Sequence, residues 1–253
     1  MRYRILAVMS ALLTAALPLL AQSAREQIAL GDRAYADRRI DAAITAYVTA
    51  LRAEPKNYEA LWKAARSTMD HGVSLPKGEQ QDSAFTLAER YATAAVRANP
   101  RDPQGHYLLA RVMGVRSMGT SVMTRIRYGK VVRSEALEAM RYDSLHPGAL
   151  HVMGMWNAEV MRLNGASRAF ARSFLGADVF ALASWAEATR YLERAVAVDG
   201  DRIVHHLDLA AVYQDQGLTA KAREQYLWIT RAPEREPNDA VFKRRAADRL
   251  RKP

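Results

Sequence analysis

Residues 27–55 have the sequence QIALGDRAYADRRIDAAITAYVTALRAEP, and the spacing of small and large side chains in this stretch decides the fold. Gly31 and Ala43 lie twelve residues apart, and each is small enough to let two antiparallel helices cross closely. Tyr47 lies where a large side chain fills the space beside that crossing. Pro55 ends the second helix, because proline has no backbone N–H to donate. The stretch therefore predicts a helical hairpin.

The same spacing returns near the C-terminus. Ala210 and Ala222 are again twelve residues apart, and Tyr226 follows Ala222 at the interval at which Tyr47 follows Ala43. This pattern is typical of the tetratricopeptide repeat, in which neighbouring hairpins cover one another's apolar faces.

Three further hairpins are predicted between these two, and the crossing residues of their paired helices are 23, 22 and 34 positions apart instead of twelve. We therefore expect an all-α fold, a right-handed α-solenoid of about five tetratricopeptide-like hairpins with long insertions between the helices of the middle three. The crossing residues are Ala65, Ala110 and Gly154 on the first helices, and their partners on the second helices are Ala88 with Ala95, Val132 with Ala139, and Ala188 with Ala195.

A last helix at Asp239–Arg251 is expected to cap the solenoid, because a terminal repeat needs a polar outer face. The predicted domain covers residues 24–253, and an irregular helical bundle is the alternative architecture.

The N-terminus has the features of an export signal. Arg2 and Arg4 precede the uncharged run 5–20, whose sixteen residues span about 24 Å as a helix, less than a hydrocarbon core of about 30 Å. Small residues near a possible cut predict a signal peptide at 1–23, removed after Ser23 or Ala21. We expect an exported, periplasmic protein; an uncleaved N-terminal membrane anchor is the alternative.

Composition excludes several classes of chemistry. The 253 residues contain no cysteine, which excludes disulfide frameworks, cysteine zinc sites and cysteine nucleophiles. The six histidines form no helical zinc motif, and the sequence has no nucleophile elbow or phosphate-binding glycine-rich loop. We therefore expect no enzymatic activity, no catalytic residue, no metal and no cofactor.

The chain resembles the regulator of microtubule dynamics family in three stretches: HVMGMWNAEVMRLNGASRAFARSFLG at 151–176, SWAEATRYLERAVAVDG at 184–200 and LDLAAVYQDQGLTAKAREQYLWI at 207–229. Members of that family are tetratricopeptide proteins whose penultimate repeats carry long insertions, so the resemblance implies the same architecture. Animal members associate with microtubules and organelle contact sites. We carry over the architecture and not that partner, because this chain begins with an export signal.

A solenoid exposes an extended concave face, and binding there is the leading hypothesis. We expect a scaffold or adaptor in the bacterial cell envelope that binds a peptide or partner protein. Aromatic and arginine side chains favour such contacts because they combine large area with directional hydrogen bonds. The helix register places the following residues in the groove: Trp62, Arg66, Tyr107, Arg111, His151, Met155, Glu159, Leu207 and Gln214.

The alternative is a peripheral protein on an anionic membrane surface. Residues 111–133 contain six Lys or Arg and no acid, which predicts a basic loop suited to an acidic protein tail, phosphate or anionic lipid. The non-functional alternative is a solvated loop whose arginines pair with acids of neighbouring helices. Nucleic acid is not expected as a partner, because an exported chain rarely meets it. Besides Arg111, the loop's cations are Arg116, Arg125, Arg127, Lys130 and Arg133; a second basic cluster lies on the last helix, at 243–252.

Overall fold

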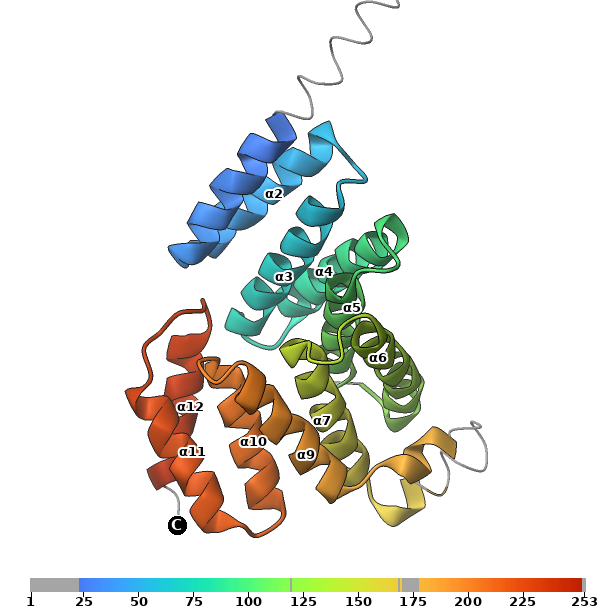
Figure 1. Ribbon diagram of the computed structural model, residues 1–253, viewed down its shortest axis with the longest axis vertical. Helices are drawn as coiled ribbons and strands as arrows, with labels where there is room; N and C mark the ends of the chain where they lie inside the picture. Colours follow the sequence, from blue (N-terminus) through green and yellow to red (C-terminus); the bar gives the residue numbers. More distant parts are fainter. Residues whose placement is uncertain (1–22, 119, 168, 170–177, 252–253) are drawn as a thin grey trace, which may run out of the picture.

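The computed structural model describes residues 23–118, 120–167, 169 and 178–251. The predicted signal peptide lies outside these residues except for Ser23. The described residues are helices joined by short connections (Figure 1). After a first helix at 23–36 come α2 (Ile40–Ala53), α3 (Tyr58–Ser74), α4 (Glu79–Ala98), α5 (Pro103–Ser117), α6 (Val122–Tyr142), α7 (Pro147–Arg162), the short 3-10 helix η1 (Asp178–Leu182), α9 (Trp185–Val198), α10 (Ile203–Asp215), α11 (Thr219–Arg231) and α12 (Asp239–Arg251).

The helices pair as the sequence predicts. The first helix packs on α2, α3 on α4, α5 on α6, α7 on α9 and α10 on α11, and α12 covers α11 at the end of the chain. The first helices of successive hairpins also touch, α3 with α5, α5 with α7, and α7 with α10. The result is an α-solenoid of the tetratricopeptide type closed by the expected capping helix.

Local sequence explains where these helices begin. The side chains of Asn57 and Asp102 accept hydrogen bonds from backbone N–H groups in the first turns of α3 and α5, at 3.0 and 2.9 Å. Ser184 does the same for α9 at 3.1 Å. Pro103 and Pro147 occupy first-turn positions, where a missing N–H costs nothing.

The predicted crossings are tight. A Cβ atom on Gly31 would lie 2.4 Å from the Tyr47 ring, and one on Gly154 would lie 2.5 Å from Cγ of Leu192 and 3.1 Å from the carbonyl oxygen of Ala188. Only a hydrogen fits at these two positions, which is why the first and fourth hairpins carry glycine there.

One part of the expectation was wrong. We predicted that the extra residues of the second and third hairpins form long loops, but their helices are instead longer, and only 75–78 and 118–121 connect them. Continuing a helix satisfies every added backbone group, whereas a long loop does not. In the fourth hairpin the insertion 163–184 does separate the two helices, and Phe180 of its described end packs on Trp156 with ring centroids 5.7 Å apart.

The solenoid curls until its ends meet. The segment between α11 and α12 reaches the first hairpin and the end of α3 (Figure 1). The Asn238 amide donates to the carbonyl oxygen of Asp70 at 3.0 Å, across 168 residues of sequence. Val73 of α3 packs against the apolar cluster of the C-terminal helices. The inner face of the first helices is therefore partly enclosed.

Candidate functional site

The predicted groove residues on α3 form a stack on the inner face. The Arg66 guanidinium lies 3.7 Å from the centroid of the Tyr35 ring and 5.1 Å from that of Trp62, both distances typical of cation–π contacts. Trp62 is half-buried against the central core. This stack places a positive charge against two partly buried aromatic rings at the N-terminal end of the inner face.

Tyr107 of α5 has a different role from the one predicted. Its side chain is 4% exposed and lies over Gly148, where a Cβ would come within 2.4 Å of the ring. Its ring also packs on that of His146, with centroids 4.9 Å apart. Tyr107 therefore fills the contact between α5 and α7 and offers little surface to a partner.

Arg111 belongs to a group that we call the inner polar cluster: Tyr35, Asp70, Arg111, Arg202 and Glu236. Arg111 Nη2 donates to Asp70 at 3.1 Å, and the Tyr35 hydroxyl donates to the same carboxylate at 2.7 Å. Arg202 lies 3.0 Å from the Glu236 carboxylate. The five side chains come from the first helix, α3, α5, the residue before α10 and the segment before α12.

The cluster remains charged although it is enclosed. Burial by itself lowers the pKa of Arg111, but Tyr107, Asp70 and Glu236 outweigh burial and raise the pKa above its ordinary value. Burial likewise lowers the pKa of Arg202, and Tyr107 and Glu236 lead the groups that raise it above the usual range. Both guanidinium groups therefore stay cationic beside their carboxylates.

Three arginines of this face each have one buried nitrogen without a hydrogen-bond acceptor among the described residues. Arg66 Nε, Arg111 Nη1 and Arg202 Nε are shielded from solvent and find no partner among the described residues. Buried donors of this kind are normally satisfied, so each can donate to an oxygen of water or of a ligand.

His151 also lies inside the molecule. Its Nδ1 is 2.7 Å from Nδ1 of His205, and its Nε2 is 3.0 Å from the Asp208 carboxylate. Burial, and next the proximity of His151, hold the pKa of His205 well below its ordinary value. The pair joins α7 to α10 through neutral His205.

The remaining predicted residues lie on α7 and α10. Met155 is half-buried, and Leu207 is 9% exposed, both in the C-terminal apolar cluster. Glu159 lies on the same helix as Met155, and the exposed Gln214 accepts a hydrogen bond from the Tyr226 hydroxyl at 2.8 Å. This part of the face is more open than the part on α5.

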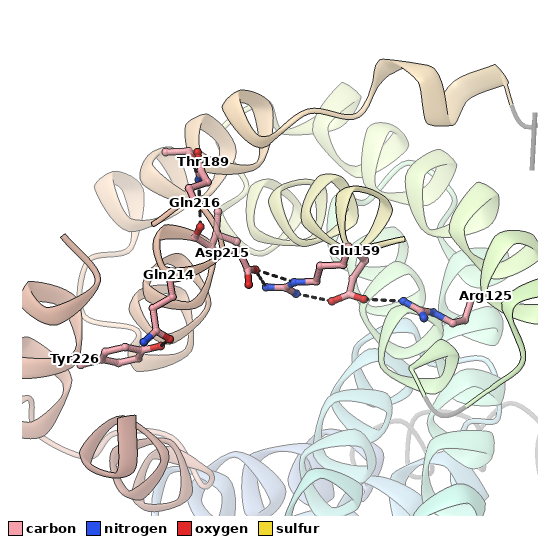
Figure 2. A network of polar contacts seen from close by, with 9 residues as sticks. Arg125, Glu159, Thr189, Gln214, Asp215, Gln216 and Tyr226 are labelled. Carbon is pink, nitrogen blue, oxygen red and sulfur yellow. Dashed lines mark hydrogen bonds and ion pairs between the residues drawn. The ribbon is translucent and has the colours of Figure 1, made fainter. Parts of the chain in front are cut away.

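A chain of ion pairs links three repeats here (Figure 2). Glu159 binds Arg125 of α6 at 3.0 Å and Arg162 of its own helix at 2.5 Å, and Arg162 in turn binds Asp215 of α10 at 2.5 Å. Gln216 continues the polar contacts to Thr189 of α9 at 2.7 Å. The side chains are about one-third exposed, so the row is accessible to a partner.

The predicted basic loop at 111–133 is not a loop. It comprises the end of α5 and the first half of α6, joined at 118–121, because the helices extend through the insertion. Arg116 pairs with Glu89, Arg125 with Glu159, and Arg133 lies 5.5 Å from the Trp156 ring centroid. Arg127 is exposed and Lys130 is half-buried, both on α6.

Sequence reasoning missed four members of the inner polar cluster. Asp70 follows Ala65 by five residues, as Glu159 follows Gly154, and Tyr35 follows Gly31 by four, as Gln214 follows Ala210, so the helix register could have found both. Arg202 and Glu236 lie outside the helices that carry the register. Nothing local marks those two.

The described residues include no group of three or more His, Asp or Glu that could hold a metal ion. Within the same part of the chain, no helix is long and apolar enough to cross a membrane.

Comparisons with known proteins agree with this architecture. A family model described as regulator of microtubule dynamics protein 1-3 matches residues 27–252. No curated protein matches the chain. The crystal structure of TTC0263, a tetratricopeptide protein of Thermus thermophilus, is 23% identical with a TM-score of 0.63, covering 90% of this chain and 98% of that one. PilF of Pseudomonas aeruginosa is 13% identical with a TM-score of 0.54, covering 91% of this chain and 86% of that one. These likenesses show the fold.

Proposed function

Because the chain belongs to the regulator of microtubule dynamics protein family, we propose that it is a non-enzymatic tetratricopeptide scaffold of the bacterial cell envelope that binds a peptide or partner protein on its inner face. The observation that carries this proposal is that the first helices of successive hairpins all place charged side chains on this face, buried at Asp70 and about one-third exposed at Glu159 and Asp215. Asp70, Arg111, Glu159 and Asp215 come from α3, α5, α7 and α10 in turn. Such a face suits an extended chain that crosses several repeats.

The chemistry of that face favours binding over catalysis. The carboxylates are paired with arginines, and His205 is held neutral inside the protein. Groups neutralised by structural partners are poor acids and bases, whereas unpaired guanidinium donors suit a polar ligand. The export signal predicted at 1–23 supports the envelope location.

A second candidate function has an observation of its own. Met118, Val122 and Met123 are 54%, 41% and 37% exposed at the connection of α5 and α6, close in sequence to the exposed Arg127. Apolar side chains beside cations suit the surface of an anionic membrane. This candidate keeps the protein in the envelope but gives it a lipid partner.

A photo-crosslinking experiment tests the first candidate against the second. A crosslinking amino acid replaces Gln214, exposed on α10, and in a matched variant replaces Arg97, exposed on the outer helix α4. We expect one protein from envelope extract, identified by mass spectrometry, to crosslink at Gln214 in low and in high salt. Crosslinks at both positions, or none, contradict inner-face binding. Sedimentation with anionic vesicles that disappears in high salt favours the membrane candidate.

A further inference from the structure

The segment 232–238, with sequence APEREPN, contacts the inner polar cluster through its residue Glu236. The Glu236 carboxylate accepts from Arg202 at 3.0 Å, and the Glu234 carboxylate accepts from Arg38 at 2.8 Å. The segment's last residue, Asn238, donates to the carbonyl oxygen of Asp70. One short stretch of the chain thus contacts the first hairpin, α3 and the start of α10.

The segment has the chemistry of a peptide ligand. It contains no helix between Arg231 and Asp239, and its two prolines oppose helix formation. In an extended chain, side chains two residues apart point to the same side, so Glu234 and Glu236 can reach two separate arginines together. Arg38 and Arg202, as hydrogen-bond donors, therefore recognise two carboxylates separated by one residue.

The middle of the segment is held by side-chain contacts that can exchange with solvent, whereas its two end residues, Ala232 and Asn238, are buried. Glu234 and Arg235 are exposed, and the side chains of the Arg38–Glu234 pair are 48% and 35% exposed. Ion pairs this exposed contribute little to stability. The Asp239 carboxylate accepts from the backbone N–H groups of Arg235 and Glu236 at 2.8 and 2.7 Å, so the segment keeps its shape from the α12 side.

The face beneath it can bind more than the segment supplies. Arg202 Nε and Arg111 Nη1 are buried and lack a partner among the described residues. An incoming chain with a further oxygen could satisfy donors that the internal segment leaves unused. The segment therefore occupies this site with fewer hydrogen bonds than an incoming chain could form.

We propose that residues 232–238 are an internal competitor that occupies the place of an acidic, proline-flanked extended segment of a partner protein, of the form Glu-x-Glu-Pro. This inference rests on the proposed function, since it names the chemistry of the partner on the same inner face. A segment tethered at both ends acts at an effective concentration of about millimolar. The partner can bind only those molecules in which the segment is released. Its apparent affinity is therefore its intrinsic affinity multiplied by the fraction of released molecules.

The test uses a fluorescent peptide with the sequence of residues 230–241 and the whole protein. Glu234→Gln with Glu236→Gln weakens the internal segment and leaves Arg38 and Arg202 in place. We expect this released variant to bind the peptide at least about tenfold more tightly than the unmodified protein. Adding Arg202→Gln to the released variant should remove the gain.

Two controls separate this effect from bulk charge. Glu79→Gln with Glu224→Gln removes two acids at exposed positions elsewhere and should leave peptide affinity unchanged. A peptide with glutamine at both glutamate positions should not bind the released variant. Equal tightening in the two double variants, or no tightening, overturns the internal competitor.

Hydrogen exchange supplies a measurement that needs no variant. Peptide at millimolar concentration should speed exchange of the Asn238 side-chain amide in the unmodified protein, because displacing the segment frees that amide from the Asp70 carbonyl oxygen. Unchanged exchange overturns the inference even where the released variant fails to fold. If the peptide experiments fail but the Gln214 crosslink still captures a protein, the inference is wrong and the proposed function stands. If the peptide behaves as expected and nothing crosslinks, the segment does compete for this site, and the capture of an envelope protein near Gln214 is wrong.

Discussion

The crossing of α7 and α9 and the seam where the C-terminal segment meets α3 hold the same protein together by opposite means. At the crossing, Gly154 lets Leu192 and the Ala188 backbone approach so closely that no added methyl group fits. At the seam, Arg111 binds Asp70 and Arg202 binds Glu236 through partly buried charges. One contact is apolar and within a hairpin; the other is polar and joins different hairpins, with Asn238 donating to the Asp70 carbonyl oxygen where the two ends of the solenoid meet.

This difference teaches which contacts the protein can release. An apolar crossing is stabilised by close packing, and opening it exposes its whole area to water. A polar seam balances desolvation against charge pairing, so its net contribution is smaller, and a charged ligand can replace its partners. The crossings build the scaffold, and the seam is where a partner can compete.

Removing one charge of the seam should have the largest effect. Asp70→Ala leaves the Arg111 guanidinium, 15% exposed, without its carboxylate and removes the acceptor of the Tyr35 hydroxyl. We expect a loss of about 3–5 kcal/mol in the free energy of unfolding, measured by urea denaturation. The matched control is Glu187→Ala, which breaks an exposed pair with Arg190 and should cost less than about 0.5 kcal/mol. Equal losses would show that the seam is no more important than a surface ion pair.

Overfilling the crossing should come next. Gly154→Leu forces new atoms against Leu192 and the Ala188 carbonyl, and we expect a loss of about 2–3 kcal/mol. Gly217→Ala is the comparison, because a Cβ at Gly217 meets nothing within 4 Å although its φ of +73° is unfavourable for alanine. That backbone strain should cost about 1 kcal/mol in the same denaturation experiment. A larger loss at Gly217 would mean that the α7–α9 contact relaxes easily.

The smallest of the three expected effects is a loss of stability in acid at the link between α7 and α10. Burial, and then His151, hold the pKa of His205 below its ordinary value. Below about pH 6.5 His205 therefore binds a proton in the unfolded chain but stays neutral in the folded chain. Stability is therefore complete above that pH and falls as the pH drops toward the folded pKa, by up to about 1.4 kcal/mol per pH unit.

The measurement is the melting temperature between neutral pH and pH about 5. His205→Asn removes the titrating group and should flatten the profile. Some slope should remain, because burial also lowers the pKa of His146. An unchanged slope in the variant would show that His205 is not the group that senses acid.

The sequence alone determined the hairpins of this protein and the residues at their crossings. Small residues twelve apart, large ones beside them and helix-ending residues after each second helix act within one hairpin, so a single stretch of chain contains all the partners. Gly31 with Tyr47 shows this, and so does the capping helix, whose predicted bounds match α12. Insertion length could also be counted, but whether it forms helix or loop depended on what the added turns pack against.

Only the tertiary structure decided the character of the inner face. The register placed Tyr107 and Arg111 on one helix face, yet curvature buried the first against Gly148 and paired the second with Asp70 of the neighbouring repeat. Asn238 and Asp70, 168 residues apart, became neighbours only because the solenoid curls far enough for its C-terminal segment to reach α3. Curvature is the sum of small rotations between hairpins, and no short stretch of sequence contains that sum.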